Sequence, residues 1–159
     1  MRRFILVVLL AVFVPALLSA NEIAVTMFKL KPEGLANSIG VVVAKDTRDG
    51  LELTPYLQGL PPGEYHFNVH ENMGCGSQVN PDGSMTMGMA AGPILKRLSS
   101  VKVDENGAVT GTILARNLGL DDVRKRTFVL STHSAEETMM DKHPMGSEMR
   151  IACGSLELY

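Results

Sequence analysis

The nitrogen ligands that this chain offers to a metal ion are its histidines. His66 and His70 lie four residues apart with Asn68 between them, and His133 lies much further along the chain. Imidazole is a common ligand of both zinc and copper. In one extended strand the Cα atoms of the first two histidines would be roughly 13 Å apart, too far for direct chelation unless the strand is bulged or the side chains converge. These three of the four histidines are candidate metal ligands, and the alternative is that they are exposed and make ordinary hydrogen bonds.

Thioethers are a second set of candidate ligands, because the chain contains ten methionines. Met85, Met87 and Met89 form a Met-x-Met-x-Met sequence in a polar, glycine-rich stretch. Methionine sulfur is a soft ligand that selects Cu(I). These residues are therefore candidate copper ligands, and the alternative is that they fill packing gaps as flexible apolar side chains. Other methionines lie nearby or in a second irregular stretch, namely Met73, Met139, Met140, Met145 and Met149.

Extended strands must position these side chains. The segment 64–71 places Tyr65, Phe67 and Val69 on one face and the two histidines with Asn68 on the other, which is typical of a half-buried strand. Apolar, β-branched or alternating patterns predict further strands at 23–30, 39–44, 51–57, 99–104, 108–115, 127–132 and 149–158.

Between these strands the sequence predicts two long loops, at 72–98 and 133–148, where neither a strand nor a helix period is visible. Long irregular segments in compact domains usually serve a function. The dipeptides Asp49-Gly50 and Asn106-Gly107 predict hairpins, and a short helical turn is expected near 120–124. About eight short strands without an internal repeat predict an all-β fold, an eight-stranded Greek-key β-barrel or sandwich.

The N-terminus has the pattern of a secretory signal peptide. Arg2 and Arg3 precede an apolar run from 4 to 18, and Ser19-Ala20 supplies a small-residue cleavage site. The run is short for a membrane span, which needs about 20 residues, although an uncleaved anchor is the alternative. We expect residues 1–20 to be removed after Ala20, and residues 21–159 to form one domain that is periplasmic or secreted, without a stable membrane anchor.

The charge and the cysteines are consistent with such an exported domain. The formal net charge is −2, and it becomes more acidic once Arg2 and Arg3 are removed. Because no basic stripe is visible, nucleic acid is not expected as a partner. Cys75 and Cys153 are the two cysteines of the chain, and a pair of thiols in an exported domain most often forms a disulfide, with two free thiols as the alternative.

Several stretches together resemble the bacterial copper/zinc superoxide dismutase family. They are Leu-Gln-Gly-Leu-Pro-Pro-Gly-Glu at 57–64, Phe-Asn-Val-His-Glu-Asn at 67–72, Leu-Asp-Asp-Val-Arg at 120–124 and Arg-Ile-Ala-Cys-Gly at 150–154. The resemblance covers essentially the whole mature chain, and it implies an eight-stranded Greek-key β-barrel. It also implies that Cys75 and Cys153 form the family's disulfide and that Arg150 occupies the position of its substrate-guiding arginine.

The chain departs from this family at the expected metal ligands. Asn68 and Ser131 stand where the resemblance implies copper-binding histidines, so that only His70 of the strand motif remains. The segment 76–98 corresponds to the family's zinc loop, but it contains no histidine and its only acid is Asp82. A zinc site needs about four N, S or O ligands, so we expect no zinc. A shifted copper site that combines His70 with His66 or His133 stays open.

Three functions follow as hypotheses. The first is an exported copper-binding or copper-handling protein on a dismutase-like scaffold, which is not an efficient dismutase. The second is a superoxide dismutase with copper alone, and the third is a metal-free module that binds a protein partner on the same scaffold. The sequence leaves enzymatic activity open, as it does a protein partner or a homodimer.

Overall fold

Antiparallel strands make up most of the computed structural model, which describes residues 21–32, 34–79, 81–83, 85–132 and 149–156. The strands in these ranges are β1 (Glu22–Lys31), β2 (Gly34–Thr47), β3 (Gly50–Leu57), β4 (Gly63–His70), β5 (Gln78–Val79), β6 (Met85–Thr86), β7 (Ile94–Arg97), β8 (Val101–Val103), β9 (Val109–Thr110), β10 (Ile113–Ala115), β11 (Thr127–Thr132) and β12 (Met149–Ser155). A 3-10 turn η1 (Met89–Ala91) and a helix α1 (Leu120–Val123) complete the described elements.

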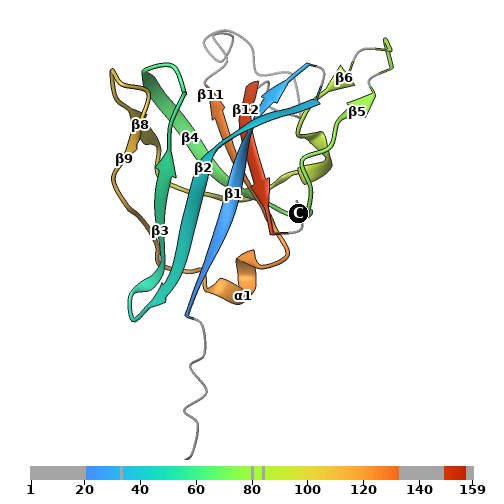
Figure 1. Cartoon of the computed structure of the whole chain (residues 1–159). Coiled ribbons are helices and arrows are strands. Elements are labelled where there is room, and N and C mark those ends of the chain that lie inside the picture. The colour runs from blue at the N-terminus through green and yellow to red at the C-terminus, as the bar shows by residue number, and fades with distance from the viewer. Residues whose placement is uncertain (1–20, 33, 80, 84, 133–148, 157–159) are drawn as a thin grey trace, which may run out of the picture.

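One curled sheet connects nearly all of these strands in the order β10-β3-β2-β1-β12-β11-β4-β8-β9 (Figure 1). β7 also pairs with β4, and β5 and β6 form a separate small hairpin. Figure 1 shows this hairpin and α1 toward opposite ends of the barrel. The architecture confirms the all-β, Greek-key barrel that the sequence predicts.

Alternating side chains place the main hydrophobic core inside the curled sheet. On β4, Tyr65, Phe67 and Val69 are buried in this core, as their alternation predicts. Phe67 contacts Phe128 of β11, with 5.5 Å between the ring centroids. β4 therefore presents His66, Asn68 and His70 on its other face.

A second, smaller core lies on that other face, around the disulfide. Cys75 and Cys153 are joined with their Cα atoms 5.8 Å apart, which confirms the predicted pairing. Both are buried, and they pack with Leu30, Ala91 and Val129. The disulfide thus fastens the loop that follows β4 onto β12, so that this face of the sheet is covered.

The same loop is held at both of its ends by hydrogen bonds. The Glu71 amide donates to the Pro93 carbonyl at 3.1 Å, and the Asn72 amide donates to the Ala91 carbonyl at 2.9 Å. The Thr127 hydroxyl of β11 donates to the Asn72 carbonyl at 2.7 Å. These bonds close the loop at its base and fix the direction in which its middle part leaves the sheet.

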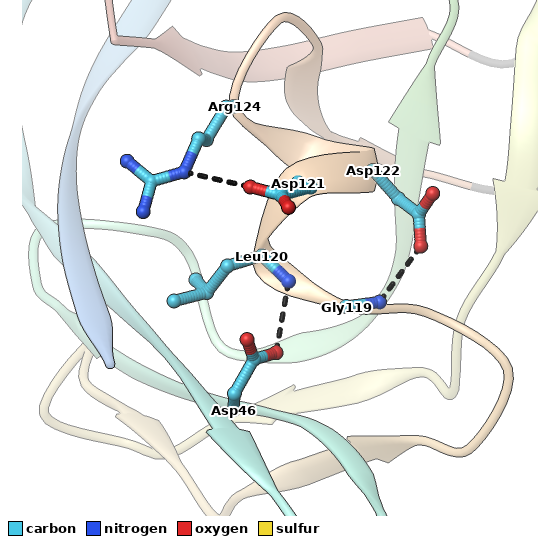
Figure 2. Close-up of polar contacts among 6 residues, drawn as sticks. All are labelled: Asp46, Gly119, Leu120, Asp121, Asp122 and Arg124. Atoms are coloured by element: carbon cyan, nitrogen blue, oxygen red, sulfur yellow. Dashed lines mark hydrogen bonds and ion pairs between the residues drawn. The ribbon is translucent and has the colours of Figure 1, made fainter. Parts of the chain in front are cut away.

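α1 is attached to the barrel through its first turn. The Asp46 carboxylate of β2 accepts the Leu120 amide at 2.9 Å, and the Asp122 carboxylate accepts the Gly119 amide at 2.8 Å (Figure 2). Both amides belong to the helix start, where no carbonyl within the helix can accept them. The helical turn expected near 120–124 is therefore present, and a side chain from a distant strand caps it.

Some predicted boundaries are wrong. The segment 72–98 is not wholly irregular, because it contains β5, β6, η1 and β7. The single strand predicted at 108–115 is two strands, β9 and β10. The turn predicted at Asp49-Gly50 lies one residue earlier, since Gly50 already pairs with Thr47.

Other predictions fall outside the described residues. These are the signal peptide at 1–20, the second long loop at 133–148 with His133, and the last residues of the strand predicted to reach 158. Within the described part of the chain, none of the helices has the length and apolar character that crossing a membrane requires.

Candidate metal site

A pocket of about 860 Å³ lies where the loop that follows β4 meets β1, β4, β7 and β12. Among the residues that line it are His70, Ser131 and Arg150 together with four methionines, Met85, Met87, Met89 and Met149. Its remaining described lining residues are Leu30, Lys31, Pro32, Gln78, Thr86, Gly92, Pro93, Ile94, Arg97 and Ile151. We call this cavity the methionine pocket.

His70 is the buried imidazole of the methionine pocket. It is 2% exposed, and its Nδ1 lies 2.8 Å from the Gly92 carbonyl oxygen. Because a carbonyl only accepts, Nδ1 must carry the proton, and in the neutral ring the lone pair is then on Nε2. In proteins, a metal-binding imidazole is commonly oriented by such a hydrogen bond from the ring nitrogen that does not bind the metal. His70 is therefore buried and oriented, unlike the exposed histidine of the alternative interpretation.

Arg150 joins β12 to the same loop. Its guanidinium donates from one terminal nitrogen to the Gly92 carbonyl at 3.0 Å and from the other to the Gly88 carbonyl. The Gly92 carbonyl thus accepts from both His70 and Arg150. This arrangement fixes η1, which carries Met89 between the two glycines, against the face of the sheet that bears the imidazole.

Both glycines hold backbone conformations that few other residues adopt. Gly88 and Gly92 have φ angles of +73°. A Cβ on Gly92 would lie 2.5 Å from the side-chain nitrogen Nδ2 of Asn72, and one on Gly88 would lie 2.9 Å from a methyl carbon of Leu30. The sequence interpretation missed these anchoring carbonyls, although the two glycines that flank Met89 were a signal for them.

The methionines line the pocket at different depths. Met87 packs against the disulfide core, whereas Met85 is 54% exposed and Met149 is 66% exposed. Met85 pairs with Val79 in the β5–β6 hairpin. Three of the four come from the Met-x-Met-x-Met sequence, so the structure brings that motif and His70 to one cavity, together with Met149 from β12.

The other residues that the sequence singles out are Ser131, which lines the pocket, and Asn68, His66 and His133, which are not among its described lining residues. Asn68 and Ser131 are each 1% exposed, and Ser131 lies opposite His66 in the pairing of β11 with β4. His66 is half-buried and is not among the described lining residues of the methionine pocket. His133 lies outside the described residues, so its role as a metal ligand stays a prediction.

The fold and this covered face define a class of protein, a disulfide-closed Greek-key barrel with a pocket beneath the loop that follows β4. Two solved structures share the fold. The Cu/Zn superoxide dismutase from Brucella abortus matches with a TM-score of 0.72 and 26% identity, over 86% of this chain and 99% of that one. The monomeric copper, zinc superoxide dismutase from Salmonella enterica matches with a TM-score of 0.73 and 28% identity, over 84% and 98% of the two chains.

Curated relatives agree. The chain is 31% identical to superoxide dismutase (Cu-Zn) 2 of Salmonella typhimurium, over 84% of this chain and 87% of the relative. It is 29% identical to the superoxide dismutase (Cu-Zn) of Escherichia coli, over 99% and 100% of the two chains. No protein-family model matches the sequence. The chain belongs to the copper/zinc superoxide dismutase family.

The described face offers few of the donors that Cu(II) and zinc prefer. Zinc takes about four N, S or O ligands and imidazole suits both metals, whereas Asn68 and Ser131 supply an amide and a hydroxyl. In the described ranges, no three His, Cys, Asp or Glu side chains gather as a metal would require. The pocket offers instead one imidazole and several thioethers, which suit a soft ion.

Proposed function

We propose that the mature chain is an exported copper-binding protein that holds Cu(I) in the methionine pocket, and that it is not an efficient superoxide dismutase. The observation that carries this proposal is that four methionines and the oriented His70 line one cavity. Thioethers and imidazole are both copper ligands, and thioethers favour the cuprous ion. Family membership supports copper as the metal, because the relatives are named for copper and zinc.

The charge of the pocket also favours Cu(I) over Cu(II). Lys31, Arg97 and Arg150 line it, and none of its described lining residues is acidic. The thioethers and a neutral imidazole bring no negative charge to a bound ion. Since Coulomb repulsion scales with the charge of the ion, a divalent metal is repelled about twice as strongly by these three cations as a monovalent one.

A competition titration tests the binding. The mature, disulfide-bonded protein is titrated with Cu(I) in the presence of a chromophoric Cu(I) chelator. We expect the wild type to bind one copper ion per chain. The double variant Met87→Leu, Met89→Leu should bind Cu(I) at least about tenfold more weakly, because two thioethers are lost while the side-chain volume is nearly kept. Met73→Leu is the matched control, because Met73 lies in the same loop outside the described lining. Equal copper binding by the wild type and the double variant would refute the site.

Dismutation is tested on the same copper-loaded sample. Catalysis requires copper to cycle between Cu(II) and Cu(I), and a thioether-rich set stabilises only the reduced ion. We therefore expect a rate per copper far below that of the E. coli relative measured in parallel. A rate equal to that of the relative would show that the copper-only dismutase is the correct alternative.

Export is proposed from the N-terminal pattern and from the bacterial relatives. Expression of the full sequence in a Gram-negative host should yield a periplasmic protein whose intact mass corresponds to a chain beginning at Asn21. Retention of the full-length chain in the membrane fraction would identify the segment as an uncleaved anchor instead.

A further inference from the structure

The methionine pocket also has the features of a binding site for a small organic molecule. Its volume of about 860 Å³ falls in the range of pockets that enclose such ligands. Leu30, Ile94 and Ile151 line it together with the four methionines. Methionine side chains are flexible and polarisable, so a pocket lined by them adapts to apolar groups of different shapes.

The charged side chains among the described lining residues of the pocket all have the same sign. Lys31 comes from β1, Arg97 from β7 and Arg150 from β12, and the described lining includes no carboxylate. The whole chain, in contrast, carries a formal net charge of −2. Cations that converge on an apolar cavity raise the local concentration of anions there. The described lining of the pocket is thus positively charged, although the chain as a whole is acidic.

We propose that the methionine pocket binds an amphipathic organic anion, a small carboxylate with an aliphatic body, independently of any metal. The aliphatic body lies among the methionines and the aliphatic side chains, and the carboxylate lies toward Lys31 and Arg97. Lys31 belongs to β1 and Arg97 to β7, and both side chains line the pocket and are exposed. Arg150 contributes charge while its guanidinium also holds the Gly88 and Gly92 carbonyls.

The test uses the metal-free mature protein with ¹³C-methyl methionine, assigned by single Met→Leu substitutions. Octanoate is titrated, and octan-1-ol, octylammonium and acetate are titrated separately. We expect octanoate to cause saturable shifts at the methyls of Met85, Met87, Met89 and Met149. The methyl of Met27, which is fully buried in the main core, should not shift. Octanol and acetate should bind at least about tenfold more weakly, because each lacks one of the two interactions.

Charge-neutralising variants test the assignment of the cations. Lys31→Gln combined with Arg97→Gln should weaken octanoate binding about tenfold and leave octanol binding unchanged. The matched control combines Lys45→Gln with Arg116→Gln, since both residues are exposed and lie outside the pocket. The control should bind octanoate as the wild type does.

Each contrary outcome overturns a defined part of the proposal. Equal binding of octylammonium and octanoate would eliminate charge selection. Equal binding of acetate would reduce the site to a surface for adventitious ions, and equal shifts at Met27 would indicate a general change in the fold. Because no copper is present, octanoate binding can succeed where Cu(I) binding fails, and the two proposals are therefore tested separately.

Discussion

At the scale of single residues, the Gly92 carbonyl organises the candidate site. It accepts the Nδ1 proton of His70 and a guanidinium proton of Arg150, so that one atom sets both the imidazole orientation and the position of the loop. The sequence predicted His70 and Arg150 as functional positions through a motif resemblance. It could not predict their shared acceptor, because any residue carries a carbonyl and only the fold decides where that carbonyl points.

Arg150→Lys tests this arrangement. Lysine keeps the charge but cannot reach two carbonyls with one planar group, so the Gly88 or Gly92 carbonyl loses a partner. We expect the free energy of unfolding to fall by about 1–3 kcal/mol, measured by urea denaturation. Arg116→Lys, at an exposed position, should change it by no more than about 0.5 kcal/mol. Identical effects of the two variants would show that the double hydrogen bond does not stabilise the loop.

Tyr65 gives a prediction on pH. Its hydroxyl donates to the Pro61 carbonyl at 2.8 Å, and burial raises the pKa of Tyr65 above the ordinary value of 10.0. The unfolded chain then ionises at lower pH than the folded one, so this contribution to stability is complete below pH 10 and is lost as the pH rises through the folded pKa. Tyr65→Phe should cost about 1 kcal/mol at neutral pH.

The alkaline comparison separates ionisation from the lost hydrogen bond. Above pH 10, Tyr65→Phe should lose less stability per pH unit than the wild type, whereas Tyr56→Phe, at a position that is 62% exposed, should follow the wild type. Urea midpoints measured across this range provide the test. A Tyr65→Phe curve parallel to that of the wild type would contradict the role assigned to burial.

At the scale of elements, side-chain alternation predicted β4 closely, because this strand buries one face in the main core. Alternation did not predict β7, because its four residues alternate only between half-buried and exposed positions. This strand is held by its pairing with β4. Alternation also failed for the Met-x-Met-x-Met segment, where burial depends on the disulfide core and on Arg150. A local pattern cannot report contacts between residues that are distant in the sequence.

α1 provides a test at this scale. Asp46→Ala removes the carboxylate that accepts the Leu120 amide, and we expect a loss of about 1 kcal/mol. Asp121→Ala removes the ion pair between Asp121 and Arg124 (Figure 2). Because the side chain of Asp121 is 99% exposed, this ion pair contributes little to stability. Thermal unfolding of the two variants should rank Asp46→Ala as the less stable, and the reverse order would contradict the capping role.

At the scale of the whole molecule, the chain keeps the barrel and the disulfide of its family. The Cys75–Cys153 bond joins the loop that follows β4 to β12 and lies under the methionine pocket. Replacing both cysteines by serine should lower the free energy of unfolding by about 2–5 kcal/mol, as measured by urea denaturation. The double variant should also weaken Cu(I) binding, because Met87 packs against the disulfide core. Unchanged stability would show that the loop is held without the bond.

We propose that copper binding on this scaffold depends on thioethers in place of most imidazoles. The most direct measurement is copper X-ray absorption on the mature protein loaded with one equivalent of Cu(I). A second sample is exposed to zinc in parallel, and its bound zinc is measured. We expect a cuprous edge and two or more sulfur neighbours of the copper ion. We expect those neighbours to be lost in the Met87→Leu, Met89→Leu variant, and zinc not to bind stoichiometrically. A first shell of nitrogen and oxygen alone, unchanged in that variant, would contradict the proposal.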